Sequence, residues 1–422
     1  FEGHFTDVNG KRYQFLYTSL FGYTDKPLII GYQLPFEDAG KQIIRLASAG
    51  LTGLAILGIS IIISIFIGRK IARPIKLLAA ASQKISSLDF NKVEKLPQSR
   101  LKELNEAAEA YNTMLRGLTW FENYVPKSLV KKLMSSGDAH SETRSVTVMF
   151  TDIVDFTPQA ENMTSEAVAK MLNDHFEILA TCIEAEGGTI DKYIGDAVVA
   201  MFGAPIPAAD HAFRACVATQ RVHHKLGELR DKWQEEGEKW PEIVWKMQTR
   251  IGLNTGTCMI GNMGSRTRFN YTMMGDNVNL AARMESGAKA WGAYTMCAEA
   301  TKLECEEHGG DRLVFRRLGR IVVKGRTKAV PIFEIVGLKE HVTEQTRECI
   351  RLFEEALDKH YTFDWEGALA CLEQSKELER NMPGVTPGVV TNPSLVYLKI
   401  VAGYQVNPPP SDWDGVHVMT EK

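Results

Sequence analysis

The sequence predicts a multidomain chain in which a transmembrane helix and a helical coiled-coil segment precede an α/β sandwich. Four observations lead to this prediction. With 422 residues the chain is too long for one ordinary domain. An uncharged apolar run fills residues 46–67, and an apolar repeat with spacings of three and four follows over residues 101–118. Segments typical of strands and of helices then alternate over residues 146–338.

Residues 1–41 are predicted to be the end of an extracytoplasmic sensor domain. Asn9-Gly10 stands between two alternating stretches and is a strong two-residue hairpin signal, and KPLIIGYQL (26–34) is typical of a strand. The segment resembles the last strands of a Cache-type ligand-binding domain, which implies an extracytoplasmic ligand of unknown identity. Because Phe1 is not an initiator methionine, we expect further sequence upstream.

Residues 42–67 are predicted to form a transmembrane helix. The uncharged run LASAGLTGLAILGISIIISIFI (46–67) would span about 33 Å as a helix, which matches the hydrocarbon core of a bilayer. A buried core helix is the alternative, and the length of the run argues against it. Basic residues crowd the C-terminal side, so the positive-inside rule places residues after 68 in the cytoplasm, and we expect a bacterial inner-membrane protein. These residues are Arg69, Lys70, Arg73 and Lys76.

The net charge and the cysteine spacing argue against a nucleic-acid partner and against a thiol-bound metal. The net charge of −3 gives no electrostatic support for nucleic-acid binding, so no nucleic-acid partner is expected. All seven cysteines follow the membrane segment, and none has C-x-x-C spacing. Reduced thiols without a metal are therefore expected.

Residues 68–119 are predicted to be a helical relay. Pro74 is expected to open a helix with apolar residues through Leu88, and a loop containing Pro97 follows. The repeat from Leu101 to Leu118 forms a heptad seam that needs a partner helix. Pro74 and SRLKELNEAAEAYNTML (99–115) resemble a HAMP signalling relay, although the acidic pair that often opens its second helix is absent. A plain coiled-coil linker is the alternative, and both predict a dimer.

The predicted α/β domain occupies residues 143–339. Its expected strands are SVTVMFTD (145–152), TIDKYIGD (189–196), AVVAMFG (197–203) and KMQTRIGLNTG (246–256), and its expected helices cover about 164–186 and 208–230. A polar insert is expected at 231–242. Residues 340–422 are predicted to be a helical tail with two amphipathic helices near Leu352 and Leu369, resembling a TPR hairpin, before a proline-rich end that runs along a surface.

Two aspartates occupy matching places beside apolar strands. Asp152 ends the strand of FTDIVDFT (150–157), and Asp196 precedes the strand of IGDAVVAMF (194–202). Carboxylates on adjacent strands suit two divalent cations, which would clamp a polyphosphate and lower the pKa of an attacking hydroxyl. Backbone amides after Asp152, at Phe156 and Thr157, would cradle phosphate oxygens. Either aspartate alone would be better interpreted as a cap of a helix or turn, but the matched pair favours a metal site.

Five blocks in order resemble the catalytic domain of class III nucleotidyl cyclases. They are FTDIVDFT, DKYIGD, RIGLNTGTCMIGNMG (250–264), NYTMMGDNVNLAARMES (270–286) and the VKG of IVVKGRTK. WFENYVPKSLVKKLM, in the predicted linker 120–142, resembles the transducing segment before such domains. The resemblance covers roughly residues 120–338. It implies a ferredoxin-like sandwich that forms a homodimer with composite active sites.

The resemblance also implies residue roles. Asp152 and Asp196 correspond to ligands of two divalent cations (Mg²⁺ or Mn²⁺), joined by the Ile153 carbonyl. Asn279 would orient the ribose and Arg283 the transition-state phosphate, and their spacing places them on one helix face. The remaining correspondences are Lys324, which would neutralise the terminal phosphates, and Asp155, which stands where the family commonly has glycine.

The implied reaction is attack of a ribose 3′-hydroxyl on the α-phosphorus, which releases pyrophosphate and closes a cyclic monophosphate. Lys192 donates and Thr272 accepts hydrogen bonds, which suits adenine, whereas guanine would call for an acidic residue. Guanylate cyclases of the family show Glu and often Cys at these places. The chain therefore resembles an adenylate cyclase that uses ATP. Thr272 also places it with the branch that includes bicarbonate-responsive enzymes, which implies bicarbonate as a regulator.

Two alternatives remain open, namely a guanylate cyclase and a catalytically silent cyclase-like scaffold. A silent scaffold would have lost metal or phosphate residues, and none is lost. A diguanylate cyclase is excluded because its G-G-[DE]-E-F signature is absent. Lys192 and Asp196 stand four residues apart, so they form either one ion pair or parts of two sites. In a composite dimer Asp196 serves one site and Lys192 of the same chain serves the other.

Overall fold

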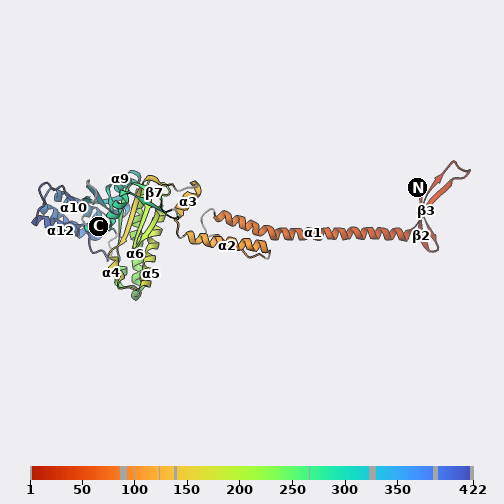
Figure 1. Cartoon of the computed structure of the whole chain (residues 1–422), viewed down its shortest axis with the longest axis horizontal. Helices are drawn as coiled ribbons and strands as arrows, with labels where there is room; N and C mark the ends of the chain where they lie inside the picture. The colour runs from red at the N-terminus through yellow and green to blue at the C-terminus, as the bar shows by residue number, and fades with distance from the viewer. Residues whose placement is uncertain are drawn as a thin grey trace. The chain divides into compact units, whose positions relative to one another are not determined.

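A computed structural model describes residues 2–85, 93–99, 101–122, 124–136, 140–265, 267–322, 329–383 and 388–418. The chain divides into two compact units, Phe1–Trp120 and Phe121–Lys422, and each is described by itself. Figure 1 labels several elements of each unit.

The first unit begins with a three-stranded antiparallel sheet in the order β1-β2-β3. Its strands are β1 (Glu2–Val8), β2 (Lys11–Leu20) and β3 (Leu28–Pro35). Asn9 and Gly10 join β1 to β2 with φ values of 52° and 75°. Both lie in the left-handed region that a type I′ turn requires, so the predicted hairpin is confirmed.

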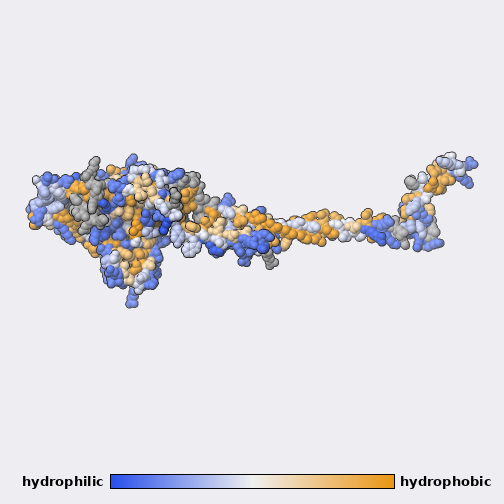
Figure 2. Space-filling view, viewed as in Figure 1, coloured by the Kyte–Doolittle hydropathy of each residue, from blue (hydrophilic) through white to orange (hydrophobic). Residues whose placement is uncertain are grey.

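One continuous helix, α1 (Phe36–Ile85), contains the whole predicted membrane segment. Residues 46–67 are exposed along it, and Figure 2 shows them as an apolar stretch. By length and composition α1 is suited to crossing a membrane. The prediction that Pro74 opens a helix is wrong, because Pro74 lies inside α1. Proline removes one backbone donor, and here the helix continues through that local loss.

The heptad seam lies on α2 (Lys102–Glu122) and packs against the C-terminal part of α1. Tyr111 and Leu115 are buried in a cluster with Ala81 of α1. The partner helix that the seam requires is thus α1 itself. Leu88 lies outside the described residues.

The second unit contains a nine-stranded mixed sheet with the order β12-β10-β11-β9-β7-β4-β6-β5, and β8 pairs with β7. Its strands are β4 (Glu142–Ile153), β5 (Thr189–Ile194), β6 (Ala197–Phe202), β7 (Thr249–Ser265), β8 (Arg268–Met274), β9 (Thr295–Ala298), β10 (Leu313–Val322), β11 (Val330–Leu338) and β12 (Val416–Val418). Its longer helices are α3 (Lys127–Ser136), α5 (Ser165–Ala185), α6 (His211–Glu235), α8 (Asp276–Trp291), α9 (Glu299–Gly309), α10 (Glu344–Tyr361), α11 (Trp365–Leu378) and α12 (Pro393–Val406).

Both faces of the central strands are buried, because their side chains alternate between two apolar clusters. On β4, Met149 and Ile153 join the cluster of α5, α6 and α9. Val146 and Val148 point into the opposite cluster, which contains residues of α3, β8 and α8. The predicted α/β sandwich is confirmed.

Two segments differ from their expected form. The insert 231–242 continues α6 to Glu235 and buries Trp233 and Trp240 in the core, so its polar composition conceals two aromatic anchors. The tail contains the two expected helices as α10 and α11, together with α12, whose apolar residues do not follow a helical period. The C-terminal end rejoins the sheet, since β12 pairs in parallel with β10.

Candidate active site

The two predicted metal aspartates lie side by side at the end of β4. β4 and β6 pair antiparallel, with Thr151 opposite Val198, so Asp152 ends next to the turn that contains Asp196. Gly195 takes a left-handed φ of 64° in that turn. The Ile153 amide donates to Asp196 Oδ2 at 3.0 Å, which fixes this carboxylate beside the first.

These residues line an open cleft of about 460 Å³. The short helix α4 (Phe156–Ala160) forms one wall, and α8 contributes another. The cleft contains most of the predicted metal and phosphate residues together with three further charged ones. The lining residues that matter here are Asp152, Ile153, Asp196, Phe156, Thr157, Arg250, Glu285 and Lys289.

The cleft concentrates negative charge. Burial and the neighbouring Asp196 carboxylate together raise the pKa of Asp152 to about 6, although the charge of Arg250 opposes the shift. Burial, with the charge of Asp152, raises the pKa of Glu285 to about 7. A bound cation would relieve this repulsion, because it favours the ionised form of both aspartates.

The donor set suits a hard divalent cation. Two carboxylates and the Ile153 carbonyl offer only oxygen ligands, which Mg²⁺ and Mn²⁺ prefer. Among the described residues no group of three Asp, Glu, His or Cys side chains could hold a metal ion. Mg²⁺ is commonly held by one or two carboxylates, with substrate phosphates and water as further ligands. The residues present therefore fit a cation that is bound together with a polyphosphate.

The backbone explains the unusual residue at the edge of the cleft. Asp155 has φ 52° and ψ 40°, in the left-handed region that glycine adopts most easily and that aspartate tolerates. Its exposed carboxylate lies 3.6 Å from Lys289 Nζ. The glycine that the cyclase family commonly has at this position is explained by the left-handed backbone of the turn, which favours glycine.

The predicted base-contacting residues meet at a second place, formed by β5 and β8. Lys192 Nζ donates to Thr272 Oγ1 at 3.2 Å. Thr272 Oγ1 in turn donates to Asp191 Oδ2 at 2.6 Å, and Lys192 Nζ lies 3.5 Å from the same oxygen. Among the described residues Lys192 forms an ion pair with Asp191 and none with Asp196. The single Lys192–Asp196 ion pair, one of the two alternatives that their spacing allowed, is therefore not formed in this chain.

Asn279 and Arg283 lie on α8, four residues apart as predicted, and neither lines the cleft around Asp152. Asn279 is exposed and Arg283 is partly exposed. Lys324 lies outside the described residues. The structure thus brings together one group around the two aspartates and another around Lys192 and Thr272, with Asn279 and Arg283 on a helix face outside the cleft.

Four charged residues escaped the sequence reasoning, among them Lys289, which lines the cleft. Arg250 stands directly opposite Asp152 in the β4–β7 register, and Glu285 lies two residues beyond Arg283 on α8. Asp191 adjoins Lys192, but regular strand alternation would send their side chains to opposite faces. Strand register and the burial of charges were the missing signals, and neither can be read from one sequence.

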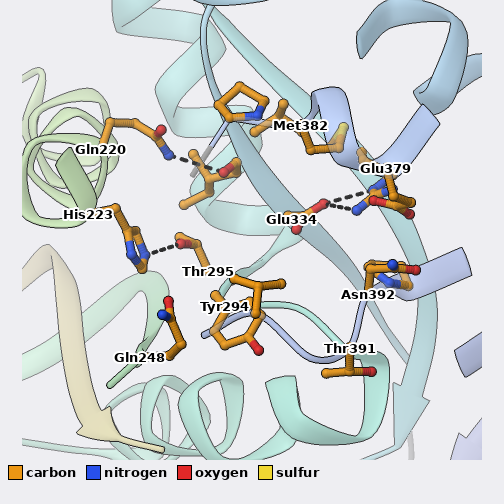
Figure 3. Close-up of a pocket in the computed structure, with 17 residues that line it drawn as sticks. Gln220, His223, Gln248, Tyr294, Thr295, Glu334, Glu379, Met382, Thr391 and Asn392 are labelled. Atoms are coloured by element: carbon orange, nitrogen blue, oxygen red, sulfur yellow. Dashed lines mark hydrogen bonds and ion pairs between the residues drawn. The ribbon is translucent and has the colours of Figure 1, made fainter. Parts of the chain in front are cut away.

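A second cavity, of about 70 Å³, lies between the sheet and the C-terminal helices (Figure 3). Its polar groups satisfy one another. Arg316 is buried and bonds to Glu334 at 2.7 Å and to Glu379 at 2.7 Å, while His223 bonds to Thr295 at 2.8 Å. Burial lowers the pKa of His223 to about 4, which keeps this ring neutral. The ion pairs of Arg316 with Glu334 on β11 and with Glu379 in the tail connect the helical tail to the sheet beside this cavity.

Comparisons with known proteins match two regions of the chain. Residues 139–337 match the family described as the adenylate and guanylate cyclase catalytic domain, and residues 66–120 match the HAMP domain. The first match overlaps the predicted catalytic region 143–339, and the second overlaps the predicted relay 68–119.

Adenylate cyclase 1 of Rhizobium meliloti is 33% identical over 319 residues, covering 74% of this chain and 46% of that protein. The adenylate cyclase of Anabaena cylindrica is 29% identical over 303 residues, covering 68% of this chain and 58% of that protein. The chain therefore spans about half the length of these relatives. The crystal structure of the adenylyl cyclase CyaB from P. aeruginosa is 31% identical and covers 47% of this chain and 96% of that one, with a TM-score of 0.40.

Proposed function

We propose that this chain, whose residues 139–337 belong to the adenylate and guanylate cyclase catalytic domain family, is an adenylate cyclase that converts ATP to 3′,5′-cyclic AMP and pyrophosphate. The observation that carries the choice of ATP is the contact between Lys192 and Thr272 at 3.2 Å. Lysine can donate to adenine N1, and a threonine hydroxyl can accept from the 6-amino group. Guanine reverses both requirements, because its N1 donates and its O6 accepts.

The cleft around Asp152 and Asp196 supports the proposed phosphoryl chemistry. These two carboxylates and the Ile153 carbonyl would hold two divalent cations. When bound, such cations supply positive charge that lowers the pKa of the 3′-hydroxyl and offsets charge on the phosphates. The backbone amides of Phe156 and Thr157 would bind phosphate oxygens at the start of α4.

The remaining roles are proposed from the family. Asn279 would orient the ribose, Arg283 would stabilise charge on the reacting phosphate, and Lys324 would bind the terminal phosphates. The 3′-oxygen bonds to the α-phosphorus as the bond to pyrophosphate breaks, and the hydroxyl proton leaves to solvent.

A homodimer with composite sites would unite the two groups of residues. Each group alone is incomplete, since Lys192 and Thr272 do not line the cleft that contains Asp196. Large apolar side chains near the Lys192–Thr272 pair are about half exposed, which suits burial against a second copy. They are Tyr193, Ile194, Phe269 and Met274.

The first unit would control this enzyme from the membrane. The exposed apolar residues of α1 suit a lipid environment, and α1 continues into the helix that packs with α2. We propose that an extracytoplasmic ligand acts on the N-terminal sheet and that the HAMP region 66–120 relays the signal to a cytoplasmic catalytic domain.

The test is to measure cyclic AMP and cyclic GMP formed by the purified full chain with Mg²⁺ or Mn²⁺. Cyclic AMP from ATP, lost on chelation of the metal, is expected. Preference for GTP would assign the chain as a guanylate cyclase, and no turnover with either nucleotide would assign it as a silent scaffold. Adding bicarbonate to the same assay tests the regulator that Thr272 implies.

A further inference from the structure

Asp191 is a buried carboxylate directly behind the proposed base-contacting pair. Only 3% of its side chain is exposed, against 41% for its neighbour Lys192. It accepts a hydrogen bond from Thr272 Oγ1 at 2.6 Å through Oδ2, while its Oδ1 is buried without a partner among the described residues. A substrate can therefore meet Lys192, but it cannot reach Asp191 directly.

An irregularity in β5 makes this arrangement possible. The β5–β6 register shifts between Ile190 and Lys192, which leaves Asp191 without an opposing residue on β6. Such a bulge re-aims side chains that regular alternation would separate. Asp191 and Lys192 consequently both contact the hydroxyl of Thr272.

The hydroxyl of Thr272 has one hydrogen and two lone pairs to share. An ionised carboxylate can only accept, so Asp191 takes the hydrogen, and an ammonium can only donate, so Lys192 uses one lone pair. One lone pair remains for a ligand. Burial raises the pKa of Asp191, and the contacts with Thr272 and Lys192 oppose this shift by favouring the ionised form.

We propose that Asp191 sets the base selectivity of this site by holding the Thr272 hydroxyl as an obligate hydrogen-bond acceptor. This inference rests on the proposed function, because it concerns how the same site distinguishes ATP from GTP. An acceptor matches the 6-amino group of adenine and opposes the O6 of guanine. A free threonine hydroxyl would instead rotate and donate to O6, so Lys192 and Thr272 alone would discriminate less. Asp191 is thus a positioning residue that acts through Thr272.

The experiment compares the full-length wild-type chain with Asp191→Asn, using kcat/KM for ATP and for GTP. The Asn amide can donate to Thr272 Oγ1, which releases the hydroxyl hydrogen toward the base. The ATP-to-GTP ratio of kcat/KM should fall by about tenfold or more, the scale of one mismatched hydrogen bond. Asp191→Ala removes the acceptor altogether and should shift the ratio in the same direction.

A second background separates positioning from a general structural effect. In Thr272→Val the hydroxyl is absent, so adding Asp191→Asn should leave the ratio of that background unchanged. A similar fall in both backgrounds would overturn the proposal, because Asp191 would then act independently of Thr272. Loss of folding in both Asp191 variants, judged by thermal melting and dimer size, would assign Asp191 a structural role and also overturn it.

The same data separate this inference from the proposed function. A wild-type chain that prefers GTP, or uses neither nucleotide, refutes the proposed function. A wild-type chain that prefers ATP, with the same preference in folded Asp191→Asn, refutes only the role of Asp191.

Discussion

The positions of Lys192 and Asp196 within one chain allow a direct test of the composite site. Lys192 bonds to Thr272, whereas Asp196 bonds to the Ile153 amide in the cleft. In a twofold dimer each site would take metal ligands from one protomer and base contacts from the other. A Lys192→Ala chain and an Asp196→Ala chain should each be nearly inactive, because every site in either homodimer carries a lesion.

Co-expression of the two variant chains should restore activity by a calculable amount. Random pairing makes half of the dimers mixed, and each mixed dimer has one doubly damaged site and one undamaged site. The expected activity is therefore about a quarter of that of the wild type. Loss of one contact to the transition-state charge costs ~100-fold in other enzymes, so the Asp196→Ala homodimer should add little to this signal. Lys192 is a base contact, so the activity of the Lys192→Ala homodimer is measured alone and subtracted as background.

The assay measures cyclic AMP formation by the unfractionated co-expressed pool. Tandem purification of differently tagged chains from the same cells confirms that mixed dimers form, and these purified mixed dimers should have about half of the wild-type activity. Asp152→Ala co-expressed with Asp196→Ala is the matched control. Both lesions then fall in the same half of the site, every metal pair is incomplete, and no rescue is expected. Absence of rescue in the Lys192 and Asp196 mixture, or rescue in the control, would refute the composite-site reasoning.

Three further predictions concern stability. Since the pKa of Asp152 is raised to about 6, above its unfolded value, ionisation destabilises the fold, and metal-free stability should increase as pH falls through 6. Asp152→Asn should therefore raise the metal-free Tm at neutral pH, and a gain that persists below about pH 4 would contradict this. Arg316→Met leaves two buried carboxylates uncompensated and should cost about 3–5 kcal/mol in urea unfolding, whereas Arg351→Met, at an exposed helical pair, should change little. The free energy of unfolding of Asp155→Ala should be about 1 kcal/mol lower than that of Asp155→Gly, because only glycine adopts the left-handed φ without strain. The alanine variant should therefore have the lower Tm, and equal Tm values would contradict this.

Local chemistry accounts for what could be predicted from the sequence. Periodicity located the strands and helices of the sandwich, because burial on one or two faces imposes its own spacing on each segment. Asp152 and Asp196 could be selected as a pair, because each stands at the end of an apolar strand, where a carboxylate needs a partner. Lys192 and Thr272 could be assigned to the base from the number of donors and acceptors that each side chain carries.

The sequence by itself determined the order of the elements, the apolar span of α1 and the residue types available for catalysis, because these properties are local to each segment. Only the tertiary structure decided which distant charges meet. The β4–β7 register set Arg250 opposite Asp152, the irregularity in β5 turned Asp191 toward Thr272, and docking of the tail buried Arg316 between two carboxylates. Each of these depends on the pairing of segments far apart in the chain, and such pairing is selected by burial and register together, which no single stretch of sequence encodes.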